Sequence, residues 1–449
     1  MKIRFVTLGC KLNFAESSAI GKALLERGHV RAKQGEEADV CVINTCSVTD
    51  NADHKDRQAI HRIHRQNPNA IIIVTGCYAQ LQPEQVAQIE GVDYVLGQNE
   101  KYDIPKLVAT LESDAAKAAM GRSQSELLDA PMELLARGDE ARRREAEISV
   151  CAIREVDDFH GAYSKDDRTR CFIKVQDGCN YFCTYCTIPH ARGKSRNPHI
   201  SEIVSDAQEA LEKGAKELII TGVNIGDFGR STGETFLDLL KALDCLGEEA
   251  KGMDYRIRIS SCEPNLLTDE IIEFVAKSKH FAPHFHIPLQ SGSNEVLKIM
   301  GRRYTRELFA ERVKHIKKLM PNAFIGVDCM VGVRGETEEY FNDYVEFIKQ
   351  LDVSQLHVFT YSERANTRML EMDLYVVPKA ERQRRSKILH EISEEKTSTF
   401  YAQQAGREAV VLWESKKEGD MMAGFTENYV KVYRPYDKEK VNTLERIRR

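Results

Sequence analysis

Apolar strand-like runs alternate with helical segments along most of this 449-residue chain. In the first 110 residues, the pattern predicts strands at 2–8, 39–44, 70–75 and 93–96, with helices between them. Strands that are apolar almost throughout are typical of a parallel sheet buried on both faces. The chain is therefore predicted to begin with an α/β domain.

The alternation resumes after residue 170 and predicts six more strands, at 172–176, 217–221, 256–260, 284–288, 325–330 and 355–359. Six strands with interleaved helices predict a partial (β/α)6 barrel, whose chemistry belongs at the carboxyl ends of the strands. A charged helix at 380–401 and a small β module at 408–433 follow. The predicted domains are 1–111, 112–165 (a helical, charged linker or insertion), 166–400 and 401–449.

Composition excludes several classes of protein. Hydrophobic residues make up 42% of the chain, which is too many for a disordered protein. No apolar run reaches the ~20 residues that span a bilayer, and the N-terminus lacks a signal peptide, so we expect a cytoplasmic protein without membrane contact. The net charge is −5, but residues 379–449 carry 16 Lys and Arg against 12 Asp and Glu. Any nucleic acid is therefore expected to meet this C-terminal stretch.

The cysteines carry the strongest chemical signal. A reducing compartment disfavours disulfides, so the 12 cysteines point to metal or redox chemistry. Cys179, Cys183 and Cys186 form a Cys-x3-Cys-x2-Cys motif directly after the first barrel strand. Three clustered thiolates leave one metal position open, which suits an iron–sulfur cluster that binds a small molecule. A zinc site completed by His190 is the alternative.

Three further cysteines lie far apart in sequence but in equivalent places. Cys10, Cys46 and Cys77 each follow a predicted strand of the first domain by one to three residues. Loops at the carboxyl ends of parallel strands share one edge of the sheet, so these thiols are predicted to converge on a second three-ligand cluster. The alternative is that small buried cysteines suit such turns, as Cys41 suits a strand.

The Cys-x3-Cys-x2-Cys motif, with Tyr185 before its last cysteine, resembles that of the radical S-adenosylmethionine superfamily. With the second triad, the chain resembles the methylthiotransferases over nearly its whole length. The matching segments are 7–13, 44–49, 76–80, 188–196, 287–293 and 300–305. The resemblance implies two 4Fe–4S clusters, S-adenosylmethionine as cofactor, and a C-terminal TRAM-like RNA-binding domain, although Arg449 comes sooner than a complete TRAM barrel predicts. The segment 112–150 is longer than the corresponding segment that the resemblance predicts.

Three branches of this family differ in substrate: threonylcarbamoyladenosine in tRNA, isopentenyl-adenosine in tRNA, and an aspartate of a ribosomal protein. Residues 176–179 and 192–196 are most similar to the first branch. The substrate of this first branch carries a carboxylate beside the base, and cationic side chains of the protein could bind that carboxylate. The candidate substrate-binding residues are Arg192, Lys194, Arg196, Arg334 and Lys431. Arg334 lies in a segment where members of the family often have the sequence Gly-Phe-Pro-Gly-Glu, so this chain departs from the family pattern at that position. A solvated or phosphate-facing role is the alternative for each of them.

Other residues follow barrel strands and could hold the cofactor through hydroxyl, amide and backbone groups. They are Thr221, Gly222, Asn224, Ser260 and Gln290, with Tyr185 from the motif. Turn formation explains most of them nearly as well. In the last domain, Trp413, Phe425 and Tyr429 could stack on bases, although at least one is expected to be a core residue.

The resemblance implies a tRNA methylthiotransferase that modifies C2 of N6-threonylcarbamoyladenosine at position 37, beside the anticodon. An electron donor such as flavodoxin or ferredoxin is implied, and we expect a monomer. The alternatives are the other two substrates, or a zinc-structured RNA-binding protein without enzymatic activity.

Overall fold

The computed structural model describes residues 1–33, 35–120, 145–164, 169–246 and 254–449. These residues divide into two compact units. The first contains Met1–Asp157 and Thr187–Lys194, and the second contains Asp158–Cys186 and Ser195–Arg449. No helix in these ranges is both long enough and apolar enough to cross a membrane.

The first unit is built on a six-stranded sheet in which every neighbouring pair is parallel, with the order β2-β1-β3-β4-β5-β6. The strands are β1 (Lys2–Thr7), β2 (Val30–Arg31), β3 (Val40–Thr45), β4 (Ile71–Gly76), β5 (Tyr94–Leu96) and β6 (Glu147–Ser149). The four predicted strands are confirmed. The two edge strands β2 and β6 were not predicted, because they are two or three residues long and exposed, which gives no periodic signal.

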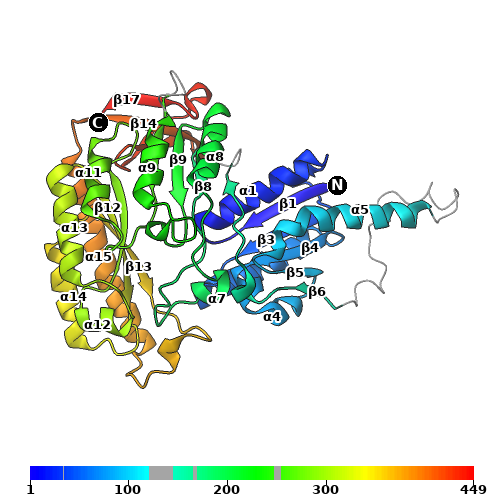
Figure 1. Cartoon of the computed structure of the whole chain (residues 1–449), viewed down its shortest axis with the longest axis horizontal. Coiled ribbons are helices and arrows are strands. Elements are labelled where there is room, and N and C mark those ends of the chain that lie inside the picture. The colour runs from blue at the N-terminus through cyan, green and yellow to red at the C-terminus, as the bar shows by residue number, and fades with distance from the viewer. Residues whose placement is uncertain (34, 121–144, 165–168, 247–253) are drawn as a thin grey trace. The chain divides into compact units, whose positions relative to one another are not determined.

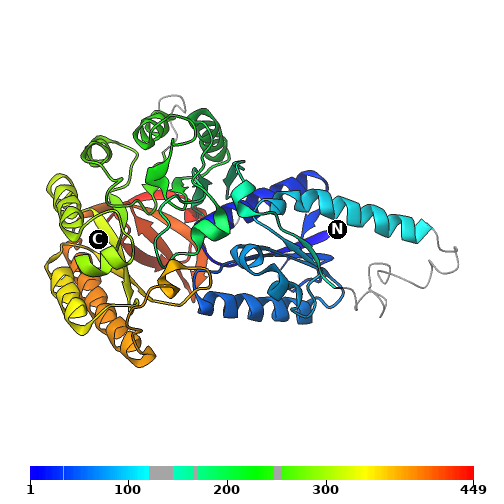
Figure 2. The ribbon, with the colours of Figure 1, turned by 60° about the horizontal axis from the view of Figure 1, so that its bottom comes forward.

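Helices cover both faces of this sheet, as Figure 2 shows. On one face, α1 (Lys11–Glu26) and α5 (Ile104–Met120) pack through Ile20, Leu24, Ile104 and Val108. On the other face, α2 (Asp50–Gln66) and α4 (Pro83–Ala87) pack through Ile60, Ile63 and Val86. The parallel sheet buried on both sides is therefore confirmed. Two short helices, α3 (Cys77–Leu81) and α7 (Ile188–Arg192), pack against each other in the same unit.

The second unit contains the partial barrel. Its strands are β8 (Cys171–Lys174), β9 (Glu217–Thr221), β10 (Arg256–Ile259), β11 (His284–Gln290), β12 (Phe324–Val331) and β13 (Gln355–Thr360). They form two parallel sheets, and a parallel bridge between Ser261 and His286 joins β10 to β11. The six predicted barrel strands are confirmed. A two-residue strand, β7 (Ala162–Tyr163), adds an antiparallel edge that the sequence did not reveal.

Helices line the outside of the barrel (Figure 1). The barrel helices are α8 (Ile200–Glu212), α9 (Phe236–Asp244), α11 (Asp269–Lys277), α12 (Asn294–Ile299), α13 (Arg306–Leu319), α14 (Glu338–Gln350) and α15 (Lys379–Gln403). Thr235, Thr268, Thr305 and Thr337 cap four of them at the N-terminus. Each cap fixes the start of a helix that follows a barrel strand, on the side of the strands' carboxyl ends.

A four-stranded antiparallel sheet follows α15, in the order β16-β15-β14-β17. Its strands are β14 (Glu408–Glu418), β15 (Met421–Thr426), β16 (Lys431–Pro435) and β17 (Leu444–Arg448). The predicted β module is confirmed, and β17 extends it beyond residue 433. This sheet packs on the barrel through a cluster of Phe324, Phe400 and Val430.

The two compact units differ from the four predicted domains. The predicted boundary at residue 111 lies inside α5, and β6 of the first sheet lies within the predicted linker. Residues 121–144 of that linker lie outside the described residues. The C-terminal sheet belongs to the same unit as the barrel, and Thr187–Lys194 belongs to the first unit. The four boundaries therefore stay predictions.

Candidate metal centres

In the first unit, Cys10, Cys46 and Cys77 lie at one edge of the sheet. Strands β1, β3 and β4 are neighbours, and Thr7, Asn44 and Thr75 are paired in register near their carboxyl ends. Cys10 precedes helix α1, Cys46 follows β3 directly, and Cys77 is the first residue of α3. Parallel pairing in this register places all three cysteine loops together.

Two glycines allow the loops to approach. A Cβ atom on Gly9 would lie 2.6 Å from the Cβ of Cys46 and 2.9 Å from its Sγ. A Cβ atom on Gly76 would lie 2.4 Å from the main-chain oxygen of Thr45. Both glycines also have positive φ, of +93° and +100°. Any larger residue would force the cysteine loops apart.

The three thiols interact electrostatically. Burial raises the pKa of Cys46 to about 12, and the neighbouring Cys77 and Cys10 raise it further. Burial also raises the pKa of Cys77. Buried thiols of this kind stay protonated unless a metal displaces the protons. The donor set therefore fits a cluster with three thiolate ligands.

Among the described residues, no group of three or more His, Cys, Asp or Glu side chains could together hold a single metal ion. Each cysteine of an iron–sulfur cluster binds a different iron, so its ligands lie farther apart than the four ligands of one tetrahedral ion.

In the second unit, the loop after β8 carries Cys179, Cys183 and Cys186. A hydrogen bond from the Cys186 amide to the Cys183 carbonyl, 3.0 Å long, closes the second half of the loop. Phe182 has a φ of +50°, which is unusual for a residue with a side chain. Burial raises the pKa of Cys179 to about 11 and also raises that of Cys183. This triad has the same buried character as the first.

Gln176 organises this loop, and sequence reasoning did not identify its role. Its fully buried amide Nε2 donates to the carbonyls of Asp177 (2.9 Å) and Gly178 (2.7 Å). Its Oε1 accepts from the amides of Val223 (3.0 Å) and Asn224 (2.8 Å) in the loop after β9. One side chain thus joins the cysteine loop to the neighbouring strand. The only sequence signal was its place directly before Asp177-Gly178-Cys179.

Arg302 is a second residue that the sequence did not single out. Its Nη1 donates to the Cys183 sulfur (3.1 Å) and to the Tyr185 hydroxyl (3.4 Å). Its Nη2 is paired with the carboxylate of Glu263. A guanidinium beside a thiolate stabilises the negative charge of a cluster.

The predicted cofactor residues lie around the same strand ends. Both polar side-chain atoms of Asn224 and the Oε1 of Gln290 are buried without a hydrogen-bond partner in the part of the chain that is described. Such groups are costly unless a ligand satisfies them. Gly222 is needed there, since a Cβ would lie 2.8 Å from the Oε1 of Gln176. Thr221 and Ser260 are buried beside them. A small polar ligand would fit this edge.

Arg192, one of the predicted substrate contacts, is buried. Its side chain is 1% exposed, and its two terminal nitrogens bind the carboxylate of Glu16 at 3.1 and 3.3 Å. A buried guanidinium held in this way is not available to a carboxylate of an RNA substrate. The pairing was missed because Glu16 lies 176 residues away in sequence.

The other predicted cations differ in exposure. Arg196 is also buried, and it binds Asp177 and the carbonyl of Asp158, so it supports the cysteine loop instead of facing solvent. Arg334 is partly exposed and pairs with Glu363 at 2.9 Å, in the loop after β12. Lys194 and Lys431 lie nearer the surface.

The three predicted aromatics of the C-terminal sheet are largely structural. Trp413 is buried, and its indole nitrogen donates to Glu445 at 2.7 Å. Phe425 and Tyr429 stack on each other at 4.9 Å, with Arg170 over both rings. Tyr433 is half exposed and carries Lys431 over its ring, so it is the better candidate for contact with a base.

Two parts of the chain match known family models. Residues 2–97 match a model described as "Uncharacterized protein family UPF0004", and residues 173–348 match the radical SAM superfamily. The chain is 36% identical to a threonylcarbamoyladenosine tRNA methylthiotransferase, MtaB, of Bacillus subtilis (strain 168), over 99% of this chain and 93% of that protein. This chain belongs to the radical SAM methylthiotransferases.

A second group of methylthiotransferases is more distant. The chain is 28% identical to a tRNA-2-methylthio-N(6)-dimethylallyladenosine synthase of Desulfitobacterium hafniense (strain Y51), over 99% of this chain and 94% of that protein. A solved structure of a radical S-adenosylmethionine methyltransferase, TsrM of Kitasatospora setae, with cobalamin and a [4Fe–4S] cluster bound, shares the fold. Its TM-score is 0.54, its identity is 14%, and the match covers 80% of this chain and 74% of that one.

Membership of the methylthiotransferases makes the chain a transferase that uses S-adenosylmethionine and 4Fe–4S clusters. The alternative of a zinc-structured RNA-binding protein is therefore wrong. The two cysteine triads and the unpaired polar groups beside the second triad fit these cofactors.

Proposed function

We propose that this methylthiotransferase inserts a methylthio group at C2 of N6-threonylcarbamoyladenosine 37 in tRNA. The observation that supports it best is the match over nearly the whole chain to a relative named for that substrate, at 36% identity. The relative named for dimethylallyladenosine matches over the same length at 28%. The difference favours the threonylcarbamoyl branch.

Each group of residues has a proposed role. Cys179, Cys183 and Cys186 would hold the cluster that binds S-adenosylmethionine, and Cys10, Cys46 and Cys77 would hold an auxiliary cluster that handles sulfur. These cofactors supply the radical, the sulfur and the methyl group. Asn224 and Gln290 satisfy their unpaired polar atoms on the bound cofactor. Gln176 keeps the cysteine loop and the cofactor loop in register.

Arg334 is the proposed contact for the threonylcarbamoyl carboxylate. It lies three residues after the end of β12, at the same end of the barrel strands as the cysteine loop after β8. Its guanidinium already pairs with a partly exposed carboxylate, Glu363, which an incoming carboxylate can replace. Arg192 and Arg196 are buried, so Arg334 is the more accessible of the three arginines. Lys194 and Lys431 remain proposed contacts for tRNA phosphates.

The partners implied by this function are tRNA, bound at its anticodon loop, and a low-potential electron donor of the flavodoxin or ferredoxin class. The monomeric state, the TRAM-like role of the C-terminal sheet and a cytoplasmic location stay predictions. The excess of basic residues over 379–449, which include α15 and the sheet, is the feature that supports RNA binding there.

Nucleoside mass spectrometry of tRNA tests the proposal. A strain lacking the gene is complemented with the wild-type chain, with Cys183→Ala, or with Cys41→Ala as a control that removes a buried thiol from the sheet core. The 2-methylthio form of threonylcarbamoyladenosine is expected to disappear on deletion, to return with the wild type and Cys41→Ala, and to stay absent with Cys183→Ala.

Other outcomes identify the alternatives. Loss of only the 2-methylthio isopentenyl nucleoside would move the chain to the second branch. If neither nucleoside changes and a ribosomal protein loses a methylthio group, the third branch is correct. Full product with Cys183→Ala would contradict the cluster assignment itself.

A further inference from the structure

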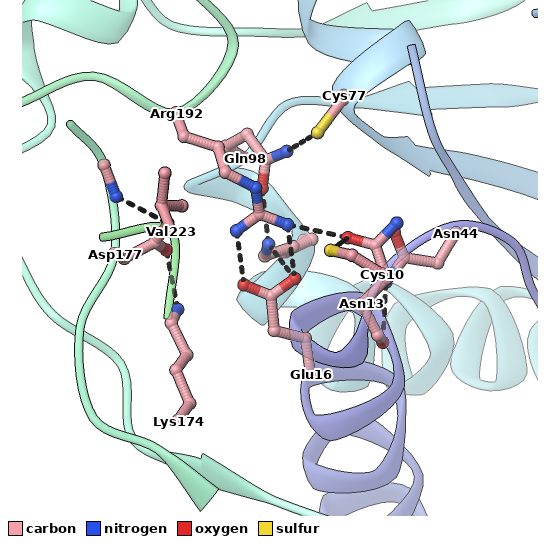
Figure 3. A network of polar contacts seen from close by, with 12 residues as sticks. Cys10, Asn13, Glu16, Asn44, Cys77, Gln98, Lys174, Asp177, Arg192 and Val223 are labelled. Carbon is pink, nitrogen blue, oxygen red and sulfur yellow. Dashed lines mark hydrogen bonds and ion pairs between the residues drawn. The ribbon is translucent and has the colours of Figure 1, made fainter. Parts of the chain in front are cut away.

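A buried group of charges lies beside the auxiliary triad in the first unit. The Glu16 carboxylate, which is fully buried, binds the guanidinium of Arg192 at 3.1 Å and the ammonium of Lys101 at 2.7 Å. All three side chains are at most 1% exposed. Two cations thus share one carboxylate, which leaves a surplus positive charge among these three residues. Figure 3 shows this network.

The network reaches the sulfur atoms of the triad. The amide of Gln98 donates to the Cys77 sulfur at 3.4 Å, and its oxygen accepts from Lys101 at 2.5 Å. Arg192 donates to the side-chain oxygen of Asn13 at 2.6 Å, and that oxygen lies 3.9 Å from the sulfur of Cys10. Arg192 also lies beside Cys77 and favours its thiolate. Two of the three sulfurs therefore face this group.

A buried surplus charge needs an anion. A 4Fe–4S cluster held by three thiolates is an anion, and it gains a further negative charge on taking up one electron. Hydrogen bonds to the sulfurs and nearby charge are the means by which a protein sets a cluster's reduction potential. The buried charges around Glu16 provide both features at the auxiliary cluster: a surplus positive charge, and a hydrogen bond from Gln98 to a sulfur atom.

We propose that Arg192, held by Glu16, is a positioning residue for the auxiliary cluster: its surplus charge stabilises the one-electron reduced cluster and so raises its reduction potential. Lys101 acts with it through Gln98. This inference rests on the proposed assignment of Cys10, Cys46 and Cys77 as ligands. Glu16 fixes the guanidinium in a bidentate pair, so Arg192 cannot turn away from the cluster.

The charges predict opposite effects for the two partners. Arg192→Gln leaves Glu16 and Lys101 as a neutral pair, so the reduced cluster loses about tenfold in stability, which for one electron corresponds to a potential lower by ~59 mV. Glu16→Gln removes the negative charge while the hydrogen bond to Asn13 still holds Arg192, so two cations stay beside the cluster and the potential is expected to rise. Arg192→Lys keeps the charge and is expected to restore most of the wild-type potential. A purely structural role would not produce shifts of opposite sign.

The measurement is an EPR-monitored redox titration with dithionite on the full-length chain. Cys179, Cys183 and Cys186 are all replaced by Ala, so that the auxiliary cluster is the only one titrated. The matched control is Arg385→Gln, which removes another buried arginine, paired with Glu336 at 2.8 Å in the second unit. The control is expected to leave the potential unchanged.

Iron and sulfide analysis accompanies each titration. If Arg192→Gln binds a full cluster at the wild-type potential, the proposal is wrong. If Arg192→Gln fails to hold the cluster, the potential of the Gln98→Leu variant is measured instead. This substitution removes the hydrogen bond to the Cys77 sulfur and leaves the ion pairs of Glu16 in place. A lower potential for Gln98→Leu supports the proposal and an unchanged one overturns it. Absence of iron from the parent triple variant would overturn the ligand assignment itself, a distinct failure.

Discussion

Two cysteines of the first sheet show how position decides the role of a thiol. Cys41 and Cys77 are both buried, but Cys41 lies inside β3 within the apolar core, whereas Cys77 lies beyond the end of β4. Burial alone raises the pKa of either thiol. Only the residue at the strand end has other thiols beside it.

Replacing Cys77 should therefore remove one cluster, whereas replacing Cys41 should remove none. Reconstituted Cys77→Ala is expected to hold about four irons instead of about eight per chain, with sulfide reduced in proportion. Cys41→Ala is expected to keep the full complement and to lose about 1 kcal/mol or more of stability from the smaller side chain. Iron and sulfide analysis checks both; equal iron in the two variants would contradict the assignment.

Arg334 carries the prediction about substrate choice. Arg334→Gln removes a charge-assisted contact worth about 1.5–3 kcal/mol, so affinity for tRNA that bears threonylcarbamoyladenosine should fall roughly tenfold or more. Affinity for the same tRNA with unmodified adenosine should change little. Arg384→Gln, an exposed arginine on α15 paired with Glu338, is the control. Equal losses for both tRNAs would make Arg334 a phosphate contact.

At the scale of elements, arginines at the amino-terminal ends of the barrel strands bind the C-terminal sheet. Glu217 begins β9 and is paired in register with Arg256 of β10. The guanidinium of Arg256 donates to the carbonyls of Val410 and Phe425, both at 2.9 Å, and Arg258 donates to that of Glu427 at 3.1 Å. The sheet is thus held by its main chain, at the opposite end of the strands from the cysteine loop.

The Glu217 carboxylate makes this contact possible. Burial by itself would raise the pKa of Glu217, but Arg256 and Arg258 outweigh burial and hold the pKa well below its usual range. The same carboxylate pairs with both arginines and so orients them toward the sheet. Removing either one leaves a buried charge with fewer partners.

Arg258→Ala should therefore destabilise the second unit by about 3–5 kcal/mol. Thermal unfolding measured against the wild type gives the loss. Arg446→Ala is the control, because Arg446 is exposed and pairs with an exposed Glu408, a contact worth about 0–1 kcal/mol. A similar small change in both variants would show that the arginines do not hold the sheet.

At the scale of the whole molecule, long apolar strands were predictable and short edges were not. The strands β3, β4, β9 and β12 are apolar almost throughout, so their positions and the cysteines at their ends could be inferred from sequence. The edge strands β2, β6 and β7 are two or three residues long and have no period to detect. Their positions depend on neighbours far away in sequence.

The predicted site was incomplete for the same reason. Cysteine spacing carries chemical information in itself, so both triads could be identified as candidates. The roles of Gln176, Arg302 and Arg192 depend on partners 47, 119 and 176 residues away. From sequence alone, a charged residue in a loop is expected to be exposed unless its buried partner is known. For this reason Arg192 was predicted to contact the substrate.

The first unit is not one continuous piece of chain, because Thr187–Lys194 belongs to it. A fragment of residues 1–157 would lack Arg192 and the helix that packs on α3. It should unfold at a lower temperature than the same fragment joined to residues 187–194 by a glycine–serine linker. Equal melting temperatures would show that the segment adds nothing to the unit.

This interruption also limits which parts of such a protein can be exchanged by recombination. A recombination event between two relatives at residue 157 would take Glu16 from one parent and Arg192 from the other. Any divergence in that pair would leave a buried charge without its partner in the chimaera. Viable exchanges should therefore carry residues 1–157 and 187–194 together, so the cysteine loop between them would evolve with the N-terminal half although it folds with the barrel.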